Sequence, residues 1–232
     1  MIQTCTVVDK KEKEIFYDLT NSYQYIHKAR LSGLTNSLWD SGDIITFAFM
    51  DGRKLIKNKV VEVFLEWTKY ANITFEPALL TDAMIRISFK QEGSWSYLGK
   101  ECLEIPKNEP TVNFGWLTTE SKQLEIQRVV LHEFGHVLGM IHEHQNPNSD
   151  IPWNKDAIYE MYSGAPNYWN RQEIDTNFFE VYDKTMTNSS EFDRESIMLY
   201  PISNKMTYGD YEVGWNTSLS EMDKEWISSI YS

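Results

Sequence analysis

The stretch LHEFGHVLGMIHEHQNP, residues 131–147, holds four of the five histidines in this chain of 232 residues. Together with the residues before it, the stretch predicts an α-helix over residues 118–139, with Gly139 able to end it. Residues four apart on a helix lie about 40° apart on one face. His132 and His136 therefore point in the same direction, and two imidazoles placed in this way can bind one metal ion.

The residues around this histidine pair complete a recognisable metal-binding pattern. Glu133, beside the first histidine, can take a proton from a water molecule held by the metal. Gly139 can adopt a left-handed backbone conformation and turn the chain back, which returns His142 to the metal as a third ligand. The full pattern H-E-x-x-H-x-x-G-x-x-H predicts one catalytic Zn²⁺ on His132, His136 and His142, with an open fourth position.

A second element downstream supports this interpretation. The segment SIMLYP, residues 196–201, offers Met198 in a tight turn that we expect to lie under the metal. A single methionine is otherwise explained by core packing, but its position after the histidine pattern favours the turn. Tyr200 follows two residues later, where its hydroxyl can reach the metal or donate a hydrogen bond to a developing oxyanion.

The region before the histidine helix alternates predicted strands with one further helix. Runs of β-branched and aromatic residues bounded by turn residues indicate strands, and an apolar stripe among charged residues indicates a helix. The predicted strands are 44–50, 72–77, 83–90 and 110–116, and the predicted helix is 55–71. Alternation within 83–90 predicts that this strand buries only one face. The order favours a twisted mixed sheet with helices packed on it.

The chain changes character beyond residue 144, where Asn, Pro, Tyr and Trp are frequent and long periodic runs are few. The helices predicted there are 154–162 and 218–232. Ser220 and Asp223 form a capping box at the start of the last helix. For the histidine helix, Thr118 or Ser121 can act as the N-cap.

Composition limits the classes of partner. The formal net charge of −12 argues against nucleic acid or an anionic membrane, because both bind basic patches. No apolar run reaches the roughly 18 residues that a membrane span requires. The N-terminal residues lack the basic and apolar regions of a secretory signal. Cys5 and Cys102 can form one disulfide, and the sequence leaves their pairing open.

The motifs resemble those of the metzincin metallopeptidases and, within them, the astacin family of peptidases. Glu143 and His144 follow the third histidine as in the astacin H-E-x-x-H-x-x-G-x-x-H-E-H. SIMLY is similar to the astacin S-x-M-x-Y, whose tyrosine is a labile fifth zinc ligand. SWSYLG, residues 94–99, is similar to the astacin segment S-Y-V-G upstream of the edge strand of the cleft. The resemblance covers roughly residues 40 to 232.

The resemblance implies an α+β metzincin fold. Such a fold has a twisted mixed five-stranded-type sheet, two long helices above an active-site cleft, and an irregular C-terminal lobe with a terminal helix. The implied organisation is an N-terminal extension or pro-segment-like region at 1–40, a zinc-binding subdomain at 41–144, and a C-terminal subdomain with the Met-turn at 145–232.

Several departures indicate a distant branch of the family. Astacin catalytic domains carry two disulfides, which two cysteines cannot form. Gln145-Asn146-Pro147 stands where astacins have Arg-x-Asp-Arg-Asp. The family glutamate that pairs with the trimmed N-terminus corresponds to Glu143. Gly42-Asp43 resembles part of the family's latency motif, but we interpret it as the turn into the first strand.

The expected function is a zinc-dependent endopeptidase that hydrolyses protein or peptide substrates with Glu133 as the general base. The substrate would add a strand to the sheet edge near residues 111–115. We expect a monomer that acts outside the cell by family analogy, exported without a leader if the chain begins as given. His144 is either a structural hydrogen-bonding residue or part of the substrate cleft.

Three alternatives remain at this stage. A downstream glutamate, for which Glu160 is available, can replace His142 as the third ligand. The zinc can be purely structural in a binding or toxin module, although an intact Glu133 argues against it. The chain can also be an aminopeptidase-type metzincin rather than an endopeptidase.

Overall fold

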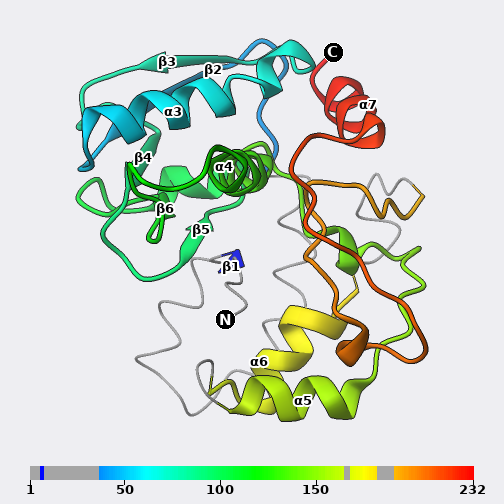
Figure 1. Cartoon of the computed structure of the whole chain (residues 1–232). Coiled ribbons are helices and arrows are strands. Elements are labelled where there is room, and N and C mark those ends of the chain that lie inside the picture. Colours follow the sequence, from blue (N-terminus) through cyan, green and yellow to red (C-terminus); the bar gives the residue numbers. More distant parts are fainter. Residues whose placement is uncertain (1–5, 8–36, 165–167, 182–190) are drawn as a thin grey trace.

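The computed structural model describes residues 6–7, 37–164, 168–181 and 191–232, and its fold is α+β (Figure 1). The strands are β1 (Thr6–Val7), β2 (Ile44–Phe49), β3 (Thr74–Pro77), β4 (Ile85–Ser88), β5 (Ser94–Ser96) and β6 (Val112–Phe114). The α-helices are α3 (Lys54–Phe64), α4 (Gln123–Val137), α5 (Lys155–Ser163), α6 (Arg171–Ile174) and α7 (Glu221–Ile230). Among these helices, none is long and apolar enough to cross a membrane.

Short helical turns connect these elements. They are η1 (Trp67–Lys69), η2 (Gly99–Glu104), η3 (Glu143–Gln145), η4 (Asp175–Phe179) and η5 (Asn204–Met206). The predicted helix 55–71 therefore ends early, at Phe64, and continues only as the turn η1. The helices predicted at 154–162 and 218–232 are present as α5 and α7.

The sheet is mixed, as the sequence predicts. Its strand order is β1-β5-β6-β4-β2-β3. The neighbours among β6, β4, β2 and β3 are parallel, whereas β5 runs antiparallel to β6. The short strand β1 adds to the outer side of β5 in the parallel direction.

The prediction that residues 111–115 lie at an edge of the sheet is wrong. They contain β6, Val112–Phe114, which lies between β5 and β4 in the interior of the sheet. The strand outside β6 is β5, Ser94–Ser96, inside the segment that the sequence analysis placed upstream of an edge strand. Three residues are too few for alternation to show, so this strand gives no periodic signal.

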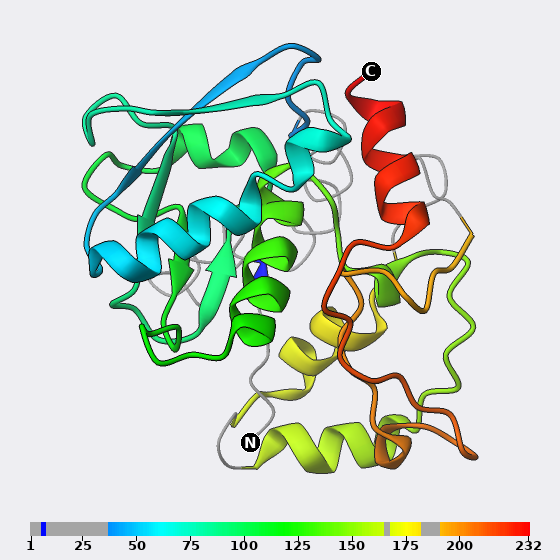
Figure 2. The ribbon, with the colours of Figure 1, turned by 45° about the horizontal axis from the view of Figure 1, so that its top comes forward.

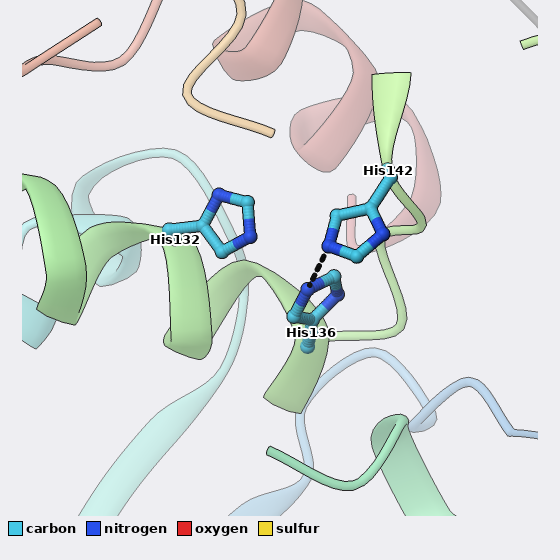
Figure 3. A group of neighbouring side chains, drawn as sticks. All are labelled: His132, His136 and His142. Carbon is cyan, nitrogen blue, oxygen red and sulfur yellow. Dashed lines mark hydrogen bonds between the residues drawn. The ribbon is translucent and has the colours of Figure 1, made fainter. Parts of the chain in front are cut away.

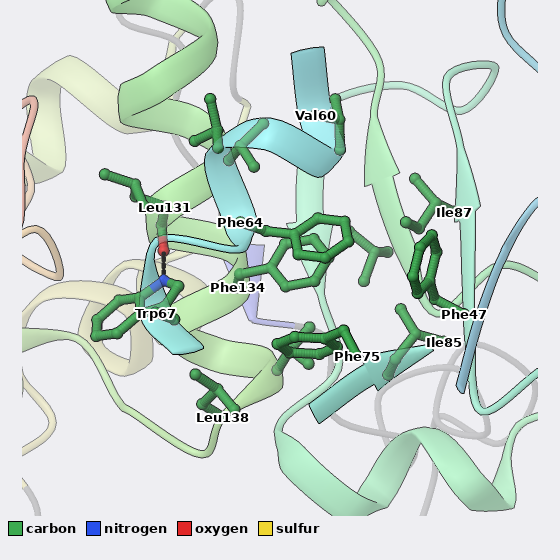
Figure 4. Close-up of a cluster of buried hydrophobic side chains, with 14 of the residues drawn as sticks. Phe47, Val60, Phe64, Trp67, Phe75, Ile85, Ile87, Leu131, Phe134 and Leu138 are labelled. Carbon is green, nitrogen blue, oxygen red and sulfur yellow. Dashed lines mark hydrogen bonds between the residues drawn. The ribbon is translucent and has the colours of Figure 1, made fainter. Parts of the chain in front are cut away.

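Two helices cover one face of the sheet. Figure 2 shows α3 crossing in front of the strands with α4 next to it, and these helices pack against each other. The buried stripe of α3 is Ile56, Val60, Val63 and Phe64. In the core, the ring of Phe64 stacks on Phe134 of α4 with centroids 4.2 Å apart (Figure 4). The indole of Trp67 donates a hydrogen bond to Leu131 O at 3.1 Å, which fixes the two helices to each other.

The opposite face of β4 is also buried, which corrects the expectation of one buried face. Arg86 is fully buried, and its guanidinium donates hydrogen bonds to the carbonyl oxygens of Ala83, Met84, Ile105, Pro106 and Glu109. A buried charge is tolerated when its donors are all satisfied in this way. Arg86 therefore fixes the loop that follows η2 against the sheet.

The start of α4 also differs from the prediction. The helix begins after Lys122, and no side chain caps it. Thr118 N instead donates to Ser121 Oγ at 2.9 Å, so the two predicted caps close a turn of their own ahead of the helix. By contrast, the capping box of Ser220 and Asp223 is present at α7.

Two other sequence interpretations concern single residues. Gly42, with φ of +89°, lies in a turn directly before β2, as the sequence predicts for Gly42-Asp43. Cys102 is buried and forms no disulfide within the described residues, and burial raises the pKa of its thiol to about 12. Cys5 lies outside the described residues, so the pairing of the two cysteines stays open.

Gly139 ends α4 in the way that the sequence predicts. Its φ is +87°, a conformation that favours glycine. Its N–H donates to His136 O at 2.8 Å, and Met140 N donates to Gly135 O at 2.9 Å. A Cβ atom on this residue would lie 2.6 Å from Leu38 Cδ2. A side chain at this position would therefore be strained by the backbone conformation, and the end of the Leu38 side chain would have to shift.

We predict that Gly139→Ala lowers the free energy of unfolding by more than the roughly 1–2 kcal/mol of left-handed strain alone. Gly209→Ala has the strain without a close neighbour, and Gly214→Ala has neither. Urea denaturation should rank the three variants in that order of destabilisation. A Gly139→Ala protein as stable as Gly214→Ala would contradict this account of the turn.

Candidate metal centre and active site

Three imidazoles converge at the end of α4. His132 and His136 lie on the helix, and the turn at Gly139 brings His142 back toward them (Figure 3). All three side chains are buried, and one nitrogen from each lies within 4.8 Å of the others. The Nε2 atoms of His136 and His142 are 3.1 Å apart.

Backbone carbonyl groups set the tautomers of two of these histidines. His132 Nδ1 lies 2.8 Å from Ile197 O, and His136 Nδ1 lies 2.7 Å from Met140 O. Because a carbonyl oxygen can only accept, each Nδ1 carries the proton and each Nε2 presents a lone pair. His132 Nε2 is buried and has no hydrogen-bond partner in the described part of the chain. Converging lone pairs with an orphaned acceptor fit a bound cation.

The protein environment keeps these imidazoles neutral. Burial lowers the pKa of His132 to about 4. Burial, and then the neighbouring histidines, lower the pKa values of His136 and His142 well below the usual range. Metal binding requires neutral imidazole, so no proton has to be removed from these ligands at neutral pH.

The predicted Met-turn lies directly against the histidine helix. Met198 is fully buried. A Cβ atom on Gly135 would come within 2.3 Å of Met198 Sδ, so the glycine makes room for the methionine. Met198 O accepts a hydrogen bond from Glu143 N at 3.0 Å. The turn therefore contacts both the helix and the segment after the third histidine.

Asp223 is a buried residue that sequence analysis assigned only to a helix cap. Its carboxylate accepts hydrogen bonds from Ser196 Oγ at 2.7 Å and Ile197 N at 2.8 Å. Burial raises its pKa above the ordinary range. Since Ile197 O in turn accepts from His132, the N-terminus of α7 is connected to the metal centre through two hydrogen bonds.

Glu133 and Tyr200 lie at one pocket beside the histidines. The pocket is open to solvent, and both residues line it together with His132. Glu133 is only 1% exposed. The Tyr200 ring lies 4.4 Å from His142 and 5.7 Å from His132, measured between centroids. A proton acceptor and a phenol are thus both adjacent to the candidate metal ligands.

The two residues after His142 face the C-terminal part of the chain. His144 Nε2 lies 2.7 Å from Asn177 O, and its ring lies 5.1 Å from the Tyr200 ring. Glu143 accepts hydrogen bonds from Asn146 Nδ2 and Asp193 N, both at 2.9 Å. Burial raises the pKa of Glu143 to about 7. Both side chains therefore link the histidine segment to the C-terminal part.

Glu160, the alternative third ligand, lies on α5 with its side chain exposed, and it is not part of the histidine group.

Two residues that support the metal site, Gly135 and Asp223, were not predicted from the sequence in this role. Gly135 could have been noticed as a glycine inside a helical pattern, whereas the contact of Asp223 with Ile197 gives no local signal.

Comparisons with known proteins agree with this geometry. The family model of the Astacin peptidase family matches residues 31–232. Two solved structures of myroilysin are similar. One is 43% identical with a TM-score of 0.82, covering 85% of this chain and 97% of that chain. The other is 38% identical with a TM-score of 0.70, covering 99% of this chain and 91% of that chain. None of the curated proteins matches.

A more remote structure shares the fold alone. It is high choriolytic enzyme 1, a hatching enzyme zinc-protease from Oryzias latipes (medaka fish), at 16% identity and a TM-score of 0.59. It aligns with 85% of this chain and 95% of that chain. The fold is thus that of the metzincins, and the buried histidines match the one catalytic zinc of such enzymes. The chain belongs to the astacin family of zinc metallopeptidases.

Proposed function

We propose that this peptidase is an endopeptidase and that Glu133 is its general base. The observation that carries the proposal is the meeting of His132, Glu133 and Tyr200 at one pocket, next to three buried neutral imidazoles. This arrangement joins a metal-binding group, a proton acceptor and a hydrogen-bond donor, which are the parts that peptide hydrolysis requires.

In the proposed mechanism, His132, His136 and His142 hold the zinc. When bound, zinc supplies a Lewis acid that polarises the scissile carbonyl and lowers the pKa of a water molecule. The Glu133 carboxylate accepts a proton from the attacking water and later delivers it to the leaving nitrogen. The Tyr200 hydroxyl donates a hydrogen bond to the carbonyl oxygen as negative charge develops there.

We place the substrate strand along β5 rather than at residues 111–115. β5 contacts α4, which carries the histidines, and it is the strand outside β6. An extended peptide added there would gain main-chain hydrogen bonds. In this structure β1 pairs with that side of β5, which supports the proposal that residues 1–40 are a pro-segment-like extension. Residues 41–144 and 145–232 would then be the two subdomains that flank the cleft.

Two other functions remain less supported. A module with a purely structural zinc would have no need for Glu133 in the pocket. An aminopeptidase would require a free substrate N-terminus, so cleavage inside peptides with a blocked N-terminus separates the two peptidase types.

We predict that Glu133→Ala lowers kcat/KM on an N-acetylated peptide by about 10²–10⁴-fold, the usual contribution of a general base. Zinc content should remain that of the wild type, because the three histidines are unchanged. The exposed Glu120 is the matched control, and Glu120→Ala should cleave normally. Cleavage by Glu133→Ala at the wild-type rate would refute its role as the base.

We predict that Tyr200→Phe lowers kcat by about 10²-fold, as expected for loss of one oxyanion donor, and changes KM little. Steady-state kinetics of zinc-loaded protein measure both constants. Tyr208→Phe alters an exposed tyrosine and serves as the control. An unchanged kcat in Tyr200→Phe would show that the hydroxyl does not act in the transition state.

We predict that His142→Ala loses bound zinc on dialysis, whereas Glu160→Ala retains it. A catalytic zinc site of this kind needs three neutral ligands. Without His142, only His132 and His136 remain on the helix, and two ligands bind zinc weakly. Zinc per chain is measured by atomic emission, with circular dichroism as a check of folding. Zinc retained by His142→Ala and lost by Glu160→Ala would reverse the ligand assignment.

A further inference from the structure

The end of α4, from which the chain turns back to His142, receives hydrogen bonds from two aromatic side chains. The last carbonyl groups of a helix have no partner within the helix and need donors from elsewhere. Here Val137 O accepts a hydrogen bond from Trp39 Nε1 at 2.7 Å. Leu138 O accepts one from the Tyr231 hydroxyl, also at 2.7 Å. Both donors belong to segments that are distant from α4 in the sequence.

The Tyr231 phenol is itself fixed from several directions. Its side chain is buried, and its hydroxyl oxygen accepts a hydrogen bond from Trp39 N at 3.3 Å. Its backbone O accepts from Asn72 N at 2.7 Å, and its backbone N donates to Ile227 O of α7 at 3.0 Å. Tyr231 therefore joins three parts of the fold: α7, the segment before β2, and the end of α4.

The hydroxyl is a permanent donor to the helix end. Burial raises the pKa of the Tyr231 phenol above its usual range, so the hydroxyl keeps the proton that it donates. A buried carbonyl group without a donor is unfavourable. If the hydroxyl were absent, the chain around Leu138 would have to move to find another donor.

Two of the zinc ligands depend on the position of this carbonyl. Met140, two residues after Leu138, supplies the carbonyl oxygen that lies 2.7 Å from His136 Nδ1 and fixes the tautomer of that ring. His142 follows two residues further along the same turn (Figure 3). A movement at Leu138 would therefore change both the tautomer of the second ligand and the approach of the third.

We propose that Tyr231 is a positioning residue of the zinc centre and that Trp39 assists it. Neither belongs to the group of histidines that can hold the metal. By fixing the turn after α4, the two side chains align His136 and His142 and so increase the affinity of the protein for Zn²⁺. This role rests on the metal site alone and is independent of the residues proposed to act on the substrate.

The test measures zinc affinity in Tyr231→Phe, which removes the hydroxyl and keeps the ring. Apo protein is titrated with zinc in competition with a chromophoric chelator, under conditions where circular dichroism shows the apo protein to be folded. We expect the dissociation constant to rise by about tenfold, the lower end of the range for residues that orient metal ligands. Trp39→Phe removes the other donor and should change the affinity in the same direction.

NMR of the histidine ring nitrogens gives a second readout, which uses neither activity nor zinc. In wild-type apo protein, the His136 ring should carry its proton on Nδ1 alone. In Tyr231→Phe the ring should populate both tautomers, because the Met140 carbonyl is no longer held at Nδ1. His132 is the internal reference, because its Nδ1 faces Ile197 O on another segment. Its single tautomer should remain in the variant.

Two control variants separate this effect from a general loss of stability. Tyr162→Phe removes the hydroxyl of a buried tyrosine in the separate apolar cluster around α5 and α6. Val60→Ala removes core volume from α3 and leaves both donors to the end of α4 unchanged. Both should keep wild-type zinc affinity, because stability alters metal affinity only when unfolded chains are populated.

The outcomes decide the role of Tyr231. Wild-type zinc affinity and a single His136 tautomer in Tyr231→Phe would overturn the proposal. An equal loss of affinity in folded Val60→Ala would also overturn it, because the effect would then be general. If Tyr231→Phe does not fold, Trp39→Phe decides by the same criteria.

Discussion

The structure depends on holding three neutral imidazoles around one point in the protein interior. Two of them are fixed because their Nδ1–H groups donate to the carbonyls of Ile197 and Met140. Each carbonyl belongs to a different segment, so the Met-turn and the turn after α4 must both be in place before the nitrogens converge. Burial lowers the imidazole pKa values, which keeps the site ready for a cation and makes it unfavourable to protonate.

The rest of the fold serves this requirement. The Phe134 ring of α4 stacks on Phe64 of α3 and meets Phe75 of β3 edge-on, so the first two histidines have a rigid support. Gly135 allows Met198 to approach the helix, and Asp223 fixes the Met-turn from the start of α7. The elements that position the site are therefore distant in sequence. The same helix also carries Glu133, so metal binding and the proposed proton transfer have one common support.

Sequence patterns revealed the parts of this arrangement that follow from local geometry. Helical spacing paired His132 with His136, and the left-handed preference of glycine explained the return of His142. Contacts between distant segments could not be predicted in this way. The burial of Arg86 was not predicted, because alternation cannot show which groups a loop brings to the second face of a strand. β5 was missed because three residues carry no period, and Asp223 was assigned to a cap because its contact with Ile197 is tertiary.

The most direct test of the central claim is a crystal structure of zinc-loaded protein with diffraction recorded at the zinc absorption edge. The account predicts one strong anomalous peak per chain, at about 2.0–2.1 Å from Nε2 of His132, His136 and His142. It also predicts that the two carbonyl contacts to Nδ1 are retained. A zinc peak bound elsewhere, or one that lacks any of these three nitrogens, would contradict it.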